Sequence, residues 1–336
     1  MSDQLETIVN IEKEFHQIVK RIFPNNFLQS SGSSGLHFTA QFSNQNLYFQ
    51  NTEYSYKDDL EFFHLTNYRN LFSILNSRSI RLYNLHNAND DKEYEYSANL
   101  IGMSPEEKER RKNNIYTFSF CPNSELENKC VWEEYGENFE GVAIVFKIDN
   151  DPKDWNNYHL AEVKYNLSSD IKEYAEKLKE LKLKYPNASF DLGLEKLMSF
   201  YKESKWKGEK EVRILTYKPH RYIEEWLKFC KRDLKIEEGR NRFTRYIELP
   251  LWVDNSSLLI TKGSEEALLD RRQNLPEDYF IKHPKIKIKD ILFGSRCGLN
   301  NEKYDTFREG IEDTIRYNLG YEVKLNLNLF SPQDIK

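Results

Sequence analysis

One charged segment of the chain runs directly into an aliphatic segment: Trp206-Lys207-Gly208-Glu209-Lys210-Glu211-Val212-Arg213-Ile214-Leu215. Its β-branched end predicts a strand that is entered through a turn at Gly208. Because successive side chains of a strand point to opposite faces, we expect Glu209, Glu211 and Arg213 to share one face. Two carboxylates about 7 Å apart beside an arginine fit either an acid/base site or a solvated ion-pair ladder.

The composition indicates a folded protein with a substantial core. The chain has 336 residues, and 14% of them are aromatic, which supplies ample core material although 31% are charged. This length predicts one large domain or two modest ones, without long disordered stretches. The net charge of −5 argues against constitutive binding to duplex nucleic acid. An enzyme that acts on nucleic acid needs only a local basic groove, so that class stays open.

The sequence contains no signal for a membrane, a metal or secretion. Residues 1–6 lack the basic and apolar regions of a secretory signal, and no run approaches the roughly 20 apolar residues of a membrane span. The cysteines lack the CxxC spacing and neighbouring histidines of a zinc site; they are Cys121, Cys130, Cys230 and Cys297. We expect a cytoplasmic protein with reduced thiols, no metal site and no membrane contact.

The hydrophobic periodicity of the sequence predicts more strands than helices. The predicted strands span residues 36–42, 62–66, 79–83, 115–120, 141–147, 159–165, 243–251, 286–293 and 321–329. The predicted helices span residues 5–23, 68–76, 105–112, 170–184, 192–204 and 301–318. This order favours an α+β fold with mixed or antiparallel sheets and flanking helices, and no glycine-rich phosphate loop supports a doubly wound sheet. We predict a helix-plus-strand appendage at 1–55 and a main domain at 56–336 with an insertion around 218–285.

Four polar motifs contain the candidates for chemistry. In chain order they are His64-Leu65-Thr66, Arg81 with the loop Asn89-Asp90-Asp91-Lys92-Glu93, Phe118-Ser119-Phe120 followed by Trp132-Glu133-Glu134-Tyr135-Gly136, and Glu209-x-Glu211-x-Arg213. Each has an ordinary structural explanation when it is taken alone: a satisfied histidine, a self-capped turn, two core aromatics and an ion-pair ladder. Their order along the chain is the more specific feature.

Taken in order, the motifs resemble a bacterial domain family of unknown function whose members look like distant ADP-ribosyltransferases. The resemblance spans residues 62–329 and includes the strand end Ile291-Leu292-Phe293-Gly294. It implies an ADP-ribosyltransferase-like fold. Two parts of the chain depart from the family pattern: the stretch between Tyr217 and Ile286 is longer, and residues 1–55 lie outside it.

The resemblance also implies a reaction and a set of roles. ADP-ribosyltransferases cleave the nicotinamide–ribose bond of NAD through a transition state with oxocarbenium character. By resemblance, Glu211 stabilises that charge and Glu209 orients the acceptor. The remaining implied contacts bind NAD: His64, supported by Thr66, at the ribose hydroxyls, Trp132 or Tyr135 stacked on nicotinamide, and Arg81 or Arg213 at the pyrophosphate.

Three functions are compatible with these motifs. The first is an ADP-ribosyltransferase that modifies a protein or a nucleic acid, as a toxin or a phage-defence effector. The second is an NAD glycohydrolase that uses water as the acceptor. The third is a non-catalytic module that binds a nucleotide-like ligand, and a structural role for every motif is a further alternative. The acceptor and the oligomeric state are not specified by the sequence.

Overall fold

The central element of the computed structural model is β5 (Ile115–Pro122), a strand with neighbours on both of its edges. The structure describes residues 2–22, 28–42, 54–85, 93–100, 103–166, 169–191, 195–218, 232–237, 242–254, 275, 278–298 and 301–327. The motif residues Asn89 and Asp90, Cys230 and much of the predicted insertion at 218–285 lie outside these ranges.

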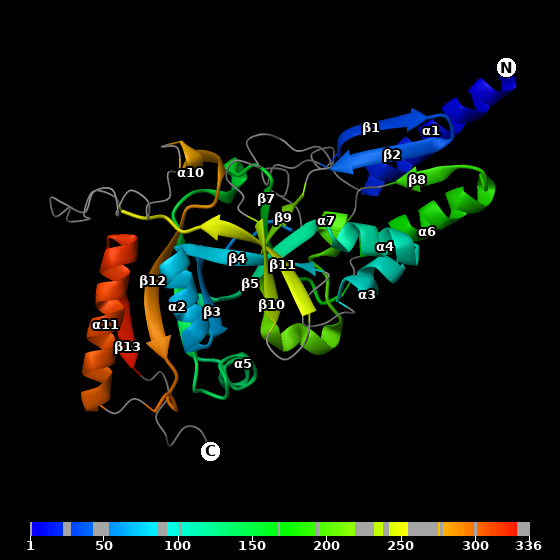
Figure 1. Ribbon diagram of the computed structural model, residues 1–336. Helices are drawn as coiled ribbons and strands as arrows, with labels where there is room; N and C mark the ends of the chain where they lie inside the picture. The colour runs from blue at the N-terminus through cyan, green and yellow to red at the C-terminus, as the bar shows by residue number, and fades with distance from the viewer. Residues whose placement is uncertain are drawn as a thin grey trace.

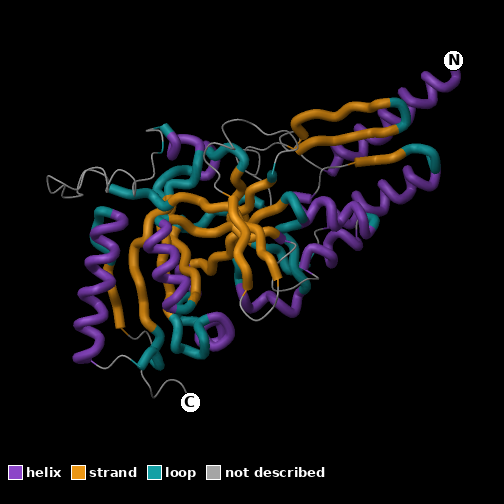
Figure 2. The backbone as a smooth tube through the Cα atoms, in the orientation of Figure 1, coloured by secondary structure: helices purple, strands orange, loops and turns teal. Residues whose placement is uncertain are grey.

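β5 is one strand of a ten-stranded sheet (Figures 1 and 2). Its other strands are β3 (Glu61–Thr66), β4 (Ser79–Asn84), β6 (Val142–Ile148), β7 (Tyr158–Glu162), β9 (Val212–Tyr217), β10 (Arg232–Glu237), β11 (Arg242–Pro250), β12 (Ile286–Phe293) and β13 (Lys324–Leu327). The order is β10-β11-β4-β5-β3-β6-β12-β13, with β9 attached to β5 and β7 attached to β9. All of these pairings are antiparallel except β12 with β13. The predicted α+β class with mixed or antiparallel sheets is therefore confirmed.

One edge of β5 is shared by two strands that separate from each other. On this edge β4 pairs with Tyr116 and Thr117, whereas β3 pairs with Cys121 and Pro122. On the opposite edge β9 pairs with β5 continuously from residue 115 to residue 120. Ser119 thus lies where the two half-sheets diverge, which leaves its backbone beside a gap in the pairing.

Helices flank the sheet (Figure 1). They are α2 (Tyr68–Ser77), α3 (Glu93–Leu100), α4 (Pro105–Lys112), α5 (Lys129–Tyr135), α7 (Glu195–Met198), α10 (Tyr279–Lys282) and α11 (Asn301–Leu319). α2 illustrates the local rules: the Asn67 side chain caps its N-terminus by accepting from the Asn70 N–H, and Leu71 and Leu75 form its buried face. Within the described residues, no helix is both long enough and apolar enough to span a membrane.

The N-terminal elements form a second, smaller group at one end of the molecule (Figure 1). α1 (Ser2–Ile22) contacts α6 (Ser169–Lys184), and the hairpin of β1 (Leu28–Ser34) and β2 (His37–Phe42) pairs with β8 (Ser189–Asp191). Phe15 and Phe38 share a core with Tyr174 and Phe190. The described helix and strands of residues 1–55 thus pack against α6 and β8, which come from the middle of the chain.

The main departure from the predicted elements lies immediately before β9. The predicted helix at 192–204 is wrong, because α7 ends at Met198 and residues 201–203 precede a separate 3₁₀ helix, Ser204–Glu209. The predicted strand entry is also wrong, since β9 begins only at Val212. Glu209 and Glu211 therefore do not share a strand face.

Candidate functional site

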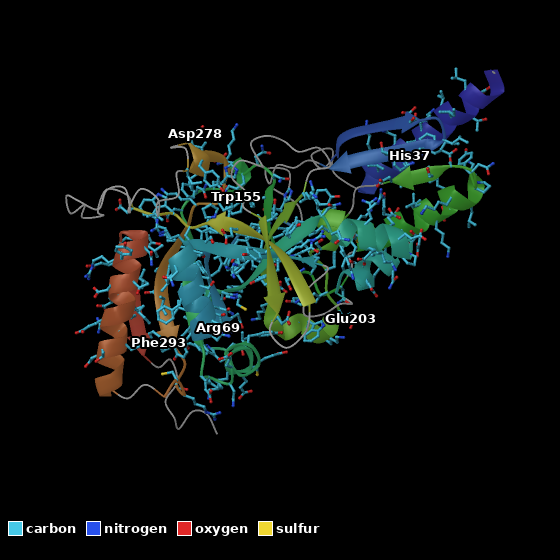
Figure 3. All side chains as sticks on the ribbon, viewed as in Figure 1. His37, Arg69, Trp155, Glu203, Asp278 and Phe293 are labelled. Atoms are coloured by element: carbon cyan, nitrogen blue, oxygen red, sulfur yellow. The ribbon has the colours of Figure 1, made fainter. Side chains whose placement is uncertain are left out.

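A turn, rather than a strand, brings the two carboxylates together. Glu209 ends the 3₁₀ helix, and the next residue, Lys210, adopts a left-handed conformation with φ of 46° before Glu211. Both carboxylates reach one ammonium: Lys202 Nζ lies 2.8 Å from Glu209 Oε2 and 2.6 Å from Glu211 Oε2. Glu203, labelled in Figure 3, immediately precedes the 3₁₀ helix that leads into this turn.

Glu211 is the buried centre of the cluster. Arg213 donates to both of its oxygens, with Nε 2.6 Å from Oε1 and Nη2 3.0 Å from Oε2, and the Ser119 hydroxyl donates to Oε1. Glu211 is 5% exposed and Arg213 is 2% exposed. Burial raises the pKa of Glu211, but Arg213 and Lys202 outweigh it and lower the pKa to about 2. Glu211 is therefore ionised at neutral pH.

The cluster reaches solvent on the side of Tyr135 and Glu209. The Tyr135 hydroxyl donates to Glu209 Oε1, and Tyr135 is 38% exposed. The Glu209 side chain is 13% exposed, compared with 5% for Glu211. Cys121 donates to the Glu209 carbonyl at 3.6 Å, and burial raises the pKa of this thiol to about 12. Cys121 is thus a protonated neighbour and not a nucleophile at neutral pH.

His64 joins the cluster through Ser119. Its Nδ1 lies 3.1 Å from the Ser119 carbonyl, the group beside the gap between β3 and β4. Because a carbonyl only accepts, Nδ1 carries the hydrogen and Nε2 is the acceptor of the neutral ring. Burial lowers the pKa of His64 to about 4, so the ring is neutral at physiological pH. Ser119 thereby connects His64 through its carbonyl with Glu211 through its hydroxyl.

Two predicted contact residues have other partners in this structure. Thr66 Oγ1 accepts from Asn70 Nδ2 at 3.0 Å, which ties the end of β3 to the first turn of α2. The Arg81 guanidinium lies 4.6 Å from the centre of the Tyr246 ring, and its Nε is 4.0 Å from Glu248 Oε1. Both residues stabilise junctions of the fold.

The structure corrects two further assignments. Trp132 is completely buried, donates to the Leu126 carbonyl at 2.8 Å and stacks on Phe139, so its ring is closed to a ligand. Tyr135 is the aromatic residue of this motif that remains exposed. Arg213 is buried and binds Glu211 and the Ser199 carbonyl, 2.5 Å from Nη1, so its guanidinium is already engaged within the protein.

Lys202 connects the two carboxylates, and the sequence gives no signal of this role. It lies in the charged run Lys202-Glu203-Ser204-Lys205, where nothing distinguishes a buried lysine from solvated ones. The same holds for Tyr165, whose hydroxyl accepts from the Glu211 N–H at 2.9 Å. Lys202 and Tyr165 are identified only by the three-dimensional path of residues 199–211, which brings Glu211 against both of them.

The left-handed turn gives a first prediction. We expect Lys210→Gly to change the free energy of unfolding by less than about 1 kcal/mol, because glycine adopts this φ freely and the exposed Lys210–Glu125 pair contributes little. Lys210→Val should destabilise the protein by about 1–2 kcal/mol, because a β-branched residue is strained there. Denaturant unfolding measures both, with Lys207→Val as the control. Equal effects of valine at 207 and 210 would contradict the prediction.

The fold and the site define an α+β protein with a buried ionised carboxylate and a neutral histidine at the junction of two half-sheets. Residues 131–214 match a family described as a protein of unknown function, DUF2971. The match covers about a quarter of the chain and includes Tyr135, Lys202, Glu209 and Glu211. This agreement supports the domain-of-unknown-function part of the resemblance. Neither the search of curated proteins nor the search of solved structures found a match.

Proposed function

We propose that this protein is an NAD-dependent ADP-ribosyltransferase that modifies a macromolecule, either a protein or a nucleic acid. The observation that supports this proposal is that Ser119, at the divergence of the half-sheets, hydrogen-bonds His64 through its carbonyl and Glu211 through its hydroxyl. These residues come from three strand regions far apart in the sequence, in the order that the resemblance implies. A toxin or a phage-defence effector is the biological context that we propose for this activity.

In the proposed reaction the bond between C1′ of the ribose and the nicotinamide nitrogen breaks. Its electron pair leaves with nicotinamide, which becomes neutral, and positive charge develops on the ribose. The ionised Glu211 carboxylate stabilises this charge and accepts from the 2′-hydroxyl. A nucleophile of the acceptor, oriented by the Glu209 carboxylate, then bonds to C1′ and releases its proton to solvent.

The neutral His64 and the exposed Tyr135 have binding roles in this proposal. The Nε2 acceptor of His64 suits a ribose hydroxyl, because Nδ1 already donates to the Ser119 carbonyl. The Tyr135 ring is the exposed aromatic surface beside Glu209 and suits stacking on nicotinamide. Arg213 positions the Glu211 carboxylate.

Incubation with labelled NAD and cell lysate tests the proposal. Transfer of label to macromolecules supports it, release of free ADP-ribose alone replaces it with a glycohydrolase, and unchanged NAD contradicts it in favour of a binding module. We expect Glu211→Gln to lower NAD cleavage about 10²–10³-fold, because the ionised carboxylate acts in the transition state.

The matched control is Glu203→Gln, which removes an exposed carboxylate paired with Lys205 at 2.7 Å. This variant should cleave NAD at the wild-type rate. Circular dichroism and thermal unfolding establish that both variants are folded. A folded Glu211→Gln protein with wild-type turnover would rule out the assigned role of Glu211.

A further inference from the structure

We propose that Lys202 is an internal cation that occupies the subsite of the substrate's positively charged nicotinamide ring, and that substrate binds by displacing it. This inference rests on the proposed function and adds a residue that controls access to Glu211. The Lys202 ammonium stands between the outer carboxylate, Glu209, and the inner one, Glu211. A ligand that enters past Glu209 toward Glu211 meets this ammonium first.

The two cations that bind Glu211 differ in their ability to move. Arg213 is 2% exposed, and its planar guanidinium is fixed by Glu211 and the Ser199 carbonyl. Lys202 has a 12% exposed side chain, and its ammonium lies at the end of a rotatable four-carbon stem. Its backbone N–H is held by the Lys164 carbonyl at 2.9 Å. The ammonium can therefore swing away while the backbone stays in place.

The charges of the cluster specify what replaces Lys202. The formal charges of the two carboxylates, the lysine and the arginine cancel, so withdrawal of the ammonium leaves one net negative charge. A pyridinium ring restores neutrality and can stack on the exposed ring of Tyr135, which donates to Glu209. Neutral nicotinamide has no such charge, so Lys202 returns to the carboxylates after cleavage and favours release of this product.

The test measures binding of 1-methylnicotinamide, a stable pyridinium cation, and of neutral nicotinamide. We expect Lys202→Met to bind the cation at least about tenfold more tightly than the wild type, because the internal competitor is gone. Its affinity for neutral nicotinamide should rise less than its affinity for the cation, because nicotinamide cannot replace the lost positive charge, and Lys202→Arg should not gain affinity for the cation. Lys205→Met is the matched control, since Lys205 is 58% exposed and pairs with Glu203 outside the cluster.

The outcome separates this inference from the proposed function. Tighter cation binding by Lys202→Met supports the subsite, even where labelled NAD stays intact and the proposed function fails. Unchanged or weaker cation binding overturns the subsite, even where the wild-type protein cleaves NAD. Lys202→Gln, which keeps a polar donor, replaces Lys202→Met if thermal unfolding shows that the methionine variant is not folded, and the same outcomes apply.

Discussion

Arg213→Met is expected to lower the free energy of unfolding by about 3–5 kcal/mol at neutral pH, because it removes one partner of a buried ion pair. Glu211 would keep Lys202 and the Ser119 hydroxyl but lose the guanidinium that binds both of its oxygens. Methionine fills a similar volume, so the effect reports the loss of the guanidinium's two bonds to Glu211 rather than a cavity. Chemical denaturation measures this loss of unfolding free energy, provided that the wild type and the variant show the same dependence on denaturant concentration.

Arg308→Met is the matched control, because it removes an ion pair with the same Nε–Oε1 distance. Arg308 Nε lies 2.6 Å from Glu312 Oε1, as Arg213 Nε does from Glu211 Oε1, but these side chains are 48% and 31% exposed. Solvent screens such a pair, so the control should lose about 1 kcal/mol or less. Equal losses in the two variants would show that burial of Glu211 and Arg213 does not govern their contribution.

The difference between wild type and Arg213→Met should also depend on pH. The pKa of Glu211 is lowered to about 2 in the folded protein, so its contribution is present above its unfolded pKa of about 4.3. That contribution is lost as the pH falls through about 4 toward 2. In the variant the folded pKa is higher and less stability is lost. The two unfolding free energies should therefore converge as the pH falls from 5 to 2, and a constant difference would contradict the assignment.

The sequence predicts the strands of the sheet well because their patterns are local. The aromatic and β-branched run at 115–120 and the aliphatic run at 142–147 identify β5 and β6. The segment before β9 was mispredicted because its conformation is set by tertiary contacts. The buried run from Leu197 to Tyr201 has helical spacing, yet Tyr201 bridges Lys164 in an extended segment. Lysine also gives no signal of the left-handed turn at position 210.

The order of the motifs along the chain predicts which segments contribute to the candidate site, but not how their side chains contact one another. The motifs at His64 and Glu211 were identified, but their connection through Ser119 depends on where β3 and β4 leave β5. The helical spacing of Trp132 and Tyr135 predicted a shared face, whereas the end of the short α5 leaves one ring buried and the other exposed. Register and burial at element ends are tertiary properties, which explains why these roles required the structure.

Gly294 packs against the loop that follows Tyr135, and we expect even a single added methyl group at Gly294 to destabilise the protein strongly. Three successive residues, Glu137, Asn138 and Phe139, have left-handed φ values of 49°, 53° and 68°. Gly294, which follows the labelled Phe293 in Figure 3, donates its N–H to the Gly141 carbonyl at 2.9 Å. This contact fixes the strained loop against the end of β12, beside the helix that presents Tyr135.

Gly294→Ala is expected to lower the free energy of unfolding by at least about 3 kcal/mol. A Cβ at this position would lie 2.2 Å from the Phe139 carbonyl oxygen and 3.1 Å from the Gly141 oxygen, and both are backbone atoms that cannot rotate away. Gly310→Ala should have the opposite sign and stabilise the protein by about 0.5–1 kcal/mol, because a Cβ in α11 meets nothing within 4 Å. Thermal and denaturant unfolding of the two variants measure this contrast. If Gly294→Ala were as stable as the wild type, the close backbone packing that holds the Tyr135 side of the site would be wrong.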